Sequence, residues 1–95
     1  MTTRREQIER ILVVRFRPLA LRIKDQSHLH AGHAGARDGR GHFDVRIVAA
    51  EFAGKSRVQR HRLVYDALAD MLLTDIHALK IQALAPDEAP SAGNE

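Results

Sequence analysis

Apolar residues recur at helical spacing near the start of the chain. This first apolar stripe consists of Ile8, Ile11, Leu12 and Phe16. Thr3 and Glu6 have the spacing of a capping box, in which the two side chains bond each other's backbone N–H groups at a helix N-terminus. Pro18 disfavours helical geometry at the residue before it. The pattern therefore predicts a helix that begins at Thr3 and ends before Pro18.

The hydrophobic period then changes to two in three later segments, which is the period of a strand with one buried face. The alternating apolar positions are Leu19, Leu21 and Ile23, then Phe43, Val45 and Ile47, then Leu79, Ile81 and Ala83. Charged or polar residues occupy most positions between them. We expect the first strand to start at Leu19, the second to run from His42 to about Ala49, and the third to follow Asp75. The first two should form a hairpin with a long loop.

A second amphipathic helix is predicted between the last two strands. Ser56 and Gln59 repeat the capping-box spacing, and the apolar stripe continues to about Leu73, which makes this the longest expected element. Its stripe consists of Val58, Val64, Ala67, Leu68, Met71 and Leu72. Three strands with one apolar face and two helices to cover it predict an α+β fold: a two-layer sandwich with a three-stranded sheet and helices on one face.

Composition excludes several classes of function. The 95 residues include no cysteine, so the chain has no disulfide, no thiolate nucleophile and no Cys-ligated metal or iron-sulfur site of its own. No catalytic triad or carboxylate pair is evident, which argues against an enzyme. The N-terminus is charged and no apolar run approaches the roughly 20 residues of a membrane span, so a cytoplasmic protein is expected. The net charge of +3 gives only a mild bias toward anionic partners.

The segment from Ser27 to Gly41 is rich in glycine, alanine and histidine and has neither periodicity. A connection of this length is more typical of a functional or flexible loop than of a simple turn. It holds three of the six histidines, namely His28, His30 and His33. Without cysteines, acidic ligands or the spacing of a structural zinc site, this cluster is by itself a weak metal signal.

Several short motifs, in order along the chain, resemble the BolA family. They are Asp25-Gln26-Ser27 with His30, His42-Phe43, Phe52-Ala53-Gly54, Gln59-Arg60-His61-Arg62-Leu63-Val64 and Ile76-His77-Ala78-Leu79. The resemblance extends from about Arg4 to Pro86. It implies a BolA-like domain at residues 1–85 with the element order αββ(α)αβ, a fold like the second class of KH domains and a short helical turn near residues 49–53. Residues 86–95, which are rich in Pro, Ala, Gly and acidic residues, are predicted to be a disordered tail.

The resemblance also implies a partner and a cofactor. BolA-like proteins share a bridging [2Fe-2S] cluster with a monothiol glutaredoxin, whose cysteine and a glutathione supply thiolates. His77 matches the family's cluster-ligating histidine, and His30 matches a second, more variable ligand. His33 is the next candidate in the loop. His42 and His61 are interpreted as structural, with His61 half-buried on the second helix.

Nucleic-acid binding is the alternative function. A KH domain clamps the phosphate backbone with a Gly-x-x-Gly loop, but this chain has Gly54-Lys55-Ser56-Arg57, without the second glycine. The candidate contacts to DNA are Lys55, Arg57, Arg60 and Arg62. A domain that binds only other proteins is a third possibility, and the chain alone is expected to be a monomer or a weak dimer.

Overall fold

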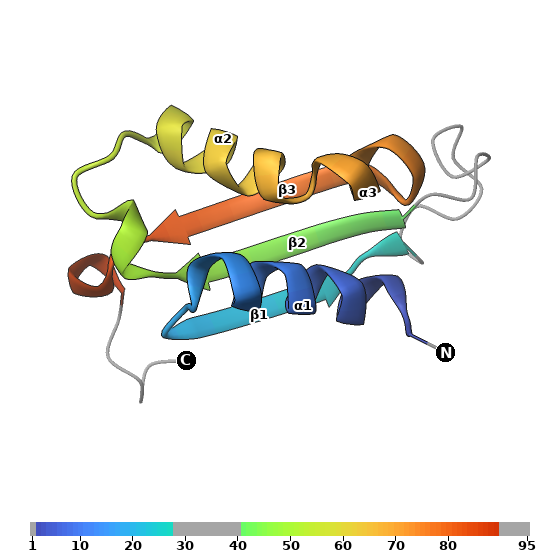
Figure 1. Ribbon diagram of the computed structural model, residues 1–95, viewed down its shortest axis with the longest axis horizontal. Helices are drawn as coiled ribbons and strands as arrows, with labels where there is room; N and C mark the ends of the chain where they lie inside the picture. Colours follow the sequence, from blue (N-terminus) through green and yellow to red (C-terminus); the bar gives the residue numbers. More distant parts are fainter. Residues whose placement is uncertain (1, 28–40, 90–95) are drawn as a thin grey trace.

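Three strands form one mixed sheet, which two helical segments cover on one side (Figure 1). The computed structural model describes residues 2–27 and 41–89. The helices and strands are α1 (Arg4–Phe16), β1 (Ala20–Asp25), β2 (Gly41–Val48), η3 (Ala50–Phe52), α2 (Arg57–Ala67), α3 (Ala69–Thr74), β3 (Ile76–Leu84) and η4 (Pro86–Glu88). The short 3-10 helix η3 confirms the helical turn expected near residues 49–53.

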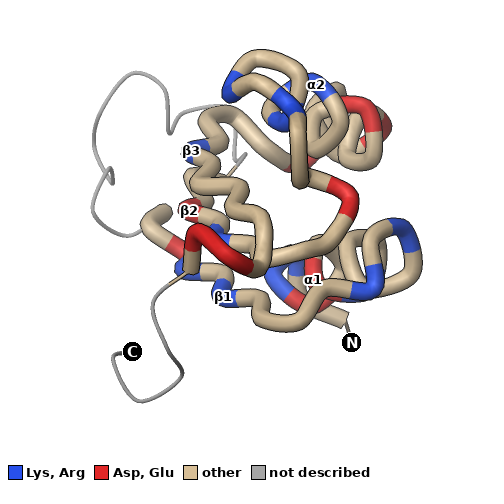
Figure 2. The backbone as a smooth tube through the Cα atoms, turned by 90° about the vertical axis from the view of Figure 1, so that its left-hand side faces the viewer, with Lys and Arg blue, Asp and Glu red and all other residues tan. Residues whose placement is uncertain are grey.

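The sheet has the order β1-β2-β3. β1 pairs with β2 in antiparallel fashion, as the predicted hairpin requires, while β2 and β3 are parallel. A parallel pair needs a crossover connection, and α2 with α3 provides it. Figure 2 shows the sheet on one side of the molecule and the helices on the other. The two-layer α+β class is therefore confirmed, and no described helix covers the second face of the sheet.

The hydrophobic core lies between the sheet and the helices. It combines the predicted apolar stripes with Phe52 of η3, which is fully buried and packs against Phe16 of α1 at a ring-centroid distance of 5.2 Å. Its buried residues are Ile8, Leu12, Phe16, Ile23, Phe43, Val45, Ile47, Ala49, Phe52, Val64, Leu68, Met71, Ile76, Ile81 and Ala83. Two predicted apolar positions are wrong: Leu19 lies before β1 and is 72% exposed, and Val58 of α2 is 65% exposed. The other alternating residues of the strands are buried or partly buried against the core, as predicted.

Both predicted capping boxes are present. The Thr3 hydroxyl accepts from the Glu6 N–H, and the Ser56 hydroxyl accepts from the Gln59 N–H. Helix α1 ends at Phe16, and the capping residue Arg17, immediately before Pro18, has a left-handed φ of 48°. The local sequence signals therefore determine where both helices begin and where α1 ends.

The second predicted helix is wrong in one respect, because it is two helices rather than one. The helix breaks at Leu68, whose φ and ψ of −102° and 15° are not helical. The N–H of Leu68 is shared between the carbonyls of Val64 and Tyr65, at 3.1 and 3.2 Å, which tightens the turn. Leu68 is fully buried at this break, and α3 continues along β3. Helix α1, with 13 residues, is consequently longer than α2, with 11.

The end of the domain also differs from the prediction of a tail disordered from Pro86. Residues 86–88 form the 3-10 helix η4, in which the Glu88 carboxylate accepts from the N–H of Ala85 at 2.8 Å. The third strand begins at Ile76, three residues before its first predicted apolar position. None of the helices in the described ranges has the length and apolar content needed to cross a bilayer.

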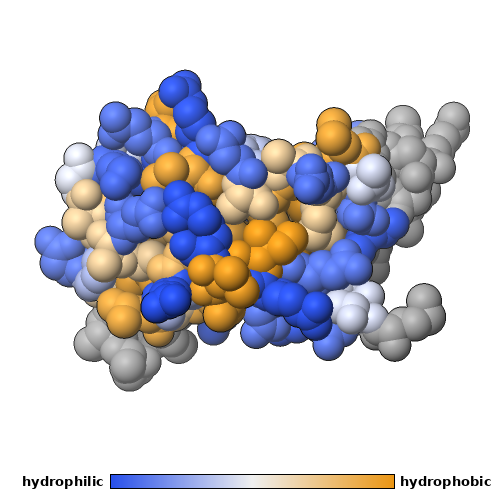
Figure 3. Space-filling view, viewed as in Figure 1, coloured by the Kyte–Doolittle hydropathy of each residue, from blue (hydrophilic) through white to orange (hydrophobic). Residues whose placement is uncertain are grey.

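The helix side carries the more apolar surface. In Figure 3, which views this side, apolar side chains gather between the two helical segments. Ile11, Val14 and Ala67 line an open groove there, with Arg10 and Arg15 beside it. The outward positions of the open sheet face are, by contrast, mainly charged.

Candidate functional site

His77 lies near the start of β3 and its side chain is exposed. The preceding residue, Ile76, is buried and anchors this end of the strand in the core. The pairing of β2 with β3 is irregular at this point: Gly41 pairs with Ile76, but His42 pairs with Ala78. His77 therefore lies between two paired positions of β3, as the extra residue of a β-bulge does. A β-bulge changes the direction in which a side chain points.

The consequence is a pair of imidazoles. The rings of His42 and His77 have a centroid distance of 5.1 Å and an interplanar angle of 51°. His77 was predicted as a ligand, whereas His42 was interpreted as structural. The structure adds His42 to the candidate site because the register shift brings the two rings together.

The end of β1 holds His42 in place. The Ser27 hydroxyl accepts from the backbone N–H of His42 at 3.0 Å, and the Ser27 N–H in turn donates to the Asp25 carboxylate at 2.9 Å. The Gln26 N–H donates to the His42 carbonyl at 2.7 Å. The Asp25-Gln26-Ser27 motif therefore positions His42 on the sheet.

Gly41 fits tightly beside this site. A Cβ added there would lie 2.6 Å from Cε2 of Phe43 and 2.8 Å from the Ser27 hydroxyl. Since the Phe43 ring is buried, it has little room to move. We expect Gly41→Ala to lower the free energy of unfolding, measured by urea titration, by about 1–3 kcal/mol. Gly54→Ala is the comparison: its Cβ would meet nothing within 4 Å, although its φ of 76° adds backbone strain. An unchanged stability for Gly41→Ala would refute the steric argument.

Neutral imidazole is a suitable ligand for iron and other transition metals. Within residues 2–27 and 41–89, however, no group of three or more His, Asp or Glu side chains could hold a metal ion. The chain also has no cysteine. The two imidazoles could therefore supply only part of the ligands that a metal ion needs. His30 and His33 lie outside the described residues, as does His28.

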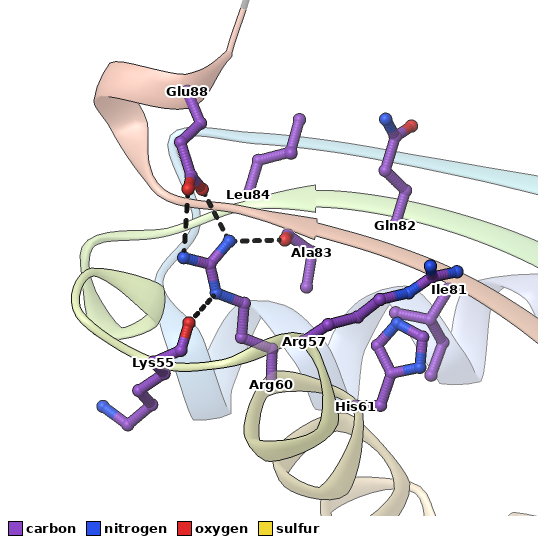
Figure 4. A pocket seen from close by; sticks show the side chains of 9 residues that line it. All are labelled: Lys55, Arg57, Arg60, His61, Ile81, Gln82, Ala83, Leu84 and Glu88. Carbon is purple, nitrogen blue, oxygen red and sulfur yellow. Dashed lines mark hydrogen bonds and ion pairs between the residues drawn. The ribbon is translucent and has the colours of Figure 1, made fainter.

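Three of the four predicted nucleic-acid contacts, Lys55, Arg57 and Arg60, line a cavity of about 530 Å³ between the N-terminal end of α2 and β3 (Figure 4). The fourth, Arg62, lies farther along α2 and outside this cavity. Arg60 is only 11% exposed in its side chain. Its guanidinium donates to the carbonyls of Lys55 and Ala83, at 2.9 and 3.1 Å, and to both carboxylate oxygens of Glu88, at 2.5 and 3.2 Å. Arg60 therefore ties α2 to the end of β3 and to η4.

Lys55, Arg57 and Arg62 differ in how accessible their charged groups are to a nucleic acid. The Lys55 ammonium donates to the Glu51 carbonyl at 2.6 Å and is partly buried. Arg57 and Arg62 are exposed. Neither forms an ion pair with any other described residue, so these two are the better placed for a partner's phosphates. His61 is half-buried, as predicted, and lines the same cavity.

The Arg60–Glu88 pair makes a pH-dependent contribution to stability. The Arg60 guanidinium, with help from the Ala85 N–H, holds the pKa of the Glu88 carboxyl below its usual value. A carboxyl with a lowered pKa in the folded state stabilises the protein above its unfolded-state pKa, and this contribution is lost as pH falls through the lower, folded value. We expect Glu88→Gln to lower the melting temperature at pH 7, and the deficit to shrink as pH falls below about 4. Asp87→Asn removes the same charge from the neighbouring residue; an equal effect of both variants would show that the ion pair has no special role.

A family model described as BolA-like protein matches residues 12–88. The chain belongs to the BolA-like family. It is 48% identical over 77 residues to protein BOLA1, chloroplastic, of Arabidopsis thaliana, covering 78% of this chain and 48% of that protein. It is 47% identical over 89 residues to SufE-like protein 1, chloroplastic/mitochondrial, of the same plant, covering 88% of this chain and 23% of that protein. The BolA-like chain thus spans about half of one relative and about a quarter of the other.

Solved structures of BolA-like proteins agree with the fold. The BolA domain of SufE1 from Arabidopsis thaliana superposes with a TM-score of 0.82 at 42% identity, over 94% of this chain and 99% of that one. BolA1 from the same plant gives a TM-score of 0.83 at 40% identity, over 95% and 99% of the two chains. The predicted family and the α+β architecture are confirmed. The likeness to KH domains, the glutaredoxin partner, the cluster and the site residues stay predictions.

Proposed function

We propose that this BolA-like chain is a non-catalytic adaptor that pairs with a monothiol glutaredoxin and co-ligates a bridging [2Fe-2S] cluster through histidine, for iron-sulfur trafficking or iron/redox regulation. The observation that carries the proposal is the exposed His77 ring beside His42, in a chain that has no cysteine. Such a chain can contribute imidazole ligands to an iron-sulfur site, and the thiolate ligands must come from a partner.

The roles of the residues follow from their positions. His77 is the primary ligand, because it is exposed at the register shift and can face a partner. His42 is the nearest described imidazole, and His30 or His33 of the loop would complete this chain's share. The glutaredoxin cysteine and glutathione would supply the thiolates. When bound, the cluster would supply an electron-transfer centre whose potential rises when imidazole replaces thiolate.

Co-expression with a monothiol glutaredoxin tests the proposal. We expect a coloured heterocomplex whose visible absorption and circular dichroism differ from those of the glutaredoxin's own cluster-bound homodimer, because imidazole replaces thiolate on the iron. Size-exclusion chromatography of the same sample reports whether the two chains migrate together. A spectrum identical to that of the homodimer would refute the proposal.

Nucleic-acid binding is the second candidate function. Two relatives are named DNA-binding transcriptional regulator BolA: the Escherichia coli protein is 39% identical and the Haemophilus influenzae protein 37% identical to this chain. The net charge of +3 agrees with an anionic partner. If this function holds, affinity for DNA should fall steeply with salt, because each phosphate contact releases condensed counterions.

The cellular location of the protein is a separate question. The plant relatives carry chloroplastic or mitochondrial names, so a cytoplasmic location stays a prediction.

A further inference from the structure

The open face of the sheet carries most of its charge in a few neighbouring positions. Burial alternates along β1 and β2, so residues next to the buried Ile23 and Val45 point away from the helices. These outward residues and their neighbours on β3 are Arg22, Lys24, Asp44, Arg46, Lys80 and Gln82. These six residues include four cations and one carboxylate. Figure 2 shows basic positions on each of the three strands. We call these four cations, Arg22, Lys24, Arg46 and Lys80, the basic sheet face.

The register places these charges in two rows across the sheet. In one row, Arg22 lies directly opposite Arg46. Like charges directly opposite each other on neighbouring strands are destabilising. In the other row, Asp44 lies between Lys24 and Lys80, yet it forms no ion pair with either at 4 Å or less. Asp44 therefore does not compensate Lys24 or Lys80 through a direct ion pair.

The cations of the helix side are of two kinds, because Arg57 and Arg62 form no ion pair with another described residue whereas other cations there do. Arg4, Arg15 and Arg60 are each paired with a carboxylate. Arg22, Lys24 and Lys80 take part in no such pair among the described residues. A shallow cavity of about 180 Å³ also lies on this face, between Arg22, Lys24, Asp44, Arg46 and Gln82.

The chemistry of this face selects its partner. Charged residues are depleted at the cores of protein–protein interfaces, and this face has no large apolar or aromatic side chain in its two charged rows. A phosphate backbone, in contrast, offers repeated negative charge that Lys and Arg neutralise. The absence of aromatic side chains also argues against stacking on unpaired bases.

We propose that the basic sheet face binds the phosphate backbone of duplex DNA, with Arg22, Lys24 and Lys80 as contacts. This inference rests on the second candidate function and moves its main surface from the N-terminal end of α2 to the open sheet. Contacts to phosphates position a protein without reading sequence. The binding should therefore be tolerant of base sequence.

Fluorescence anisotropy with a labelled DNA duplex of random sequence tests the surface. The full chain is compared with two double variants that each remove two positive charges: Arg22→Gln with Lys80→Gln on the sheet face, and Arg57→Gln with Arg62→Gln on α2. At about 50 mM salt we expect the sheet-face variant to lose at least tenfold in affinity and the α2 variant only a fewfold. The sheet-face variant should also reduce the slope of log affinity against log salt by about 2.

The possible results distinguish an error in the proposed binding surface from an error in the proposed nucleic-acid binding. If the α2 variant loses as much affinity as the sheet-face variant, or more, the function stands and the proposed surface is wrong. If the unchanged chain does not bind the duplex even at low salt, nucleic-acid binding itself is wrong. Circular dichroism and urea titration of both variants show whether either loss comes from unfolding.

Discussion

His77→Ala is expected to abolish the distinctive spectrum of the heterocomplex with a monothiol glutaredoxin. The alanine side chain has no donor atom, and the other nearby described imidazole, His42, is half-buried and less able to face a partner. Without the exposed ligand, the cluster should revert to the glutaredoxin homodimer. The measurement is visible circular dichroism of the co-expressed proteins, together with iron content of the fraction in which both chains migrate.

Two further histidine variants make this result specific. His61→Ala is the matched control, because it removes a half-buried imidazole from α2, an element distinct from the strands that carry the His42–His77 pair. It should leave the spectrum intact. His42→Ala should shift the spectrum without abolishing it, because His77 is retained. A heterocomplex spectrum that survives His77→Ala unchanged would exclude this residue as the ligand.

Phe52→Ala should cost about 3–5 kcal/mol of unfolding free energy, the usual range for truncating a buried phenylalanine. Phe52 is fully buried and packs against Phe16, so it joins η3 to α1 across the core. Urea unfolding followed by far-ultraviolet circular dichroism measures the loss, and a change below about 1 kcal/mol would contradict this view of the core.

An exposed apolar residue provides the control for this prediction. Val58 of α2 is 65% exposed, so Val58→Ala removes little buried surface. Its effect should stay within about 0.5 kcal/mol. The contrast between the two positions tests the burial of Phe52 rather than the general tolerance of the domain to alanine.

Local sequence signals predicted the elements because they act over a few residues. The capping boxes at Thr3 and Ser56 and the apolar stripe of α1 depend only on neighbours within one or two helical turns. The break at Leu68 was missed because the apolar stripe continues through it. The short helix η4 was missed because Arg60, far away in the chain, holds Glu88.

The sequence by itself determined the α+β class, most of the apolar faces of the strands and the absence of thiolates. The choice of His77 as a candidate ligand came from the resemblance to the BolA family and stays a prediction. Only the tertiary structure decided that His42 lies beside His77, that Arg60 is engaged by Glu88, and that Arg22 faces Arg46 across two strands. The physical reason is that each of these contacts depends on strand register or on packing between distant segments. A shift of one residue in register would change every neighbour across the sheet while leaving the local pattern of each strand the same.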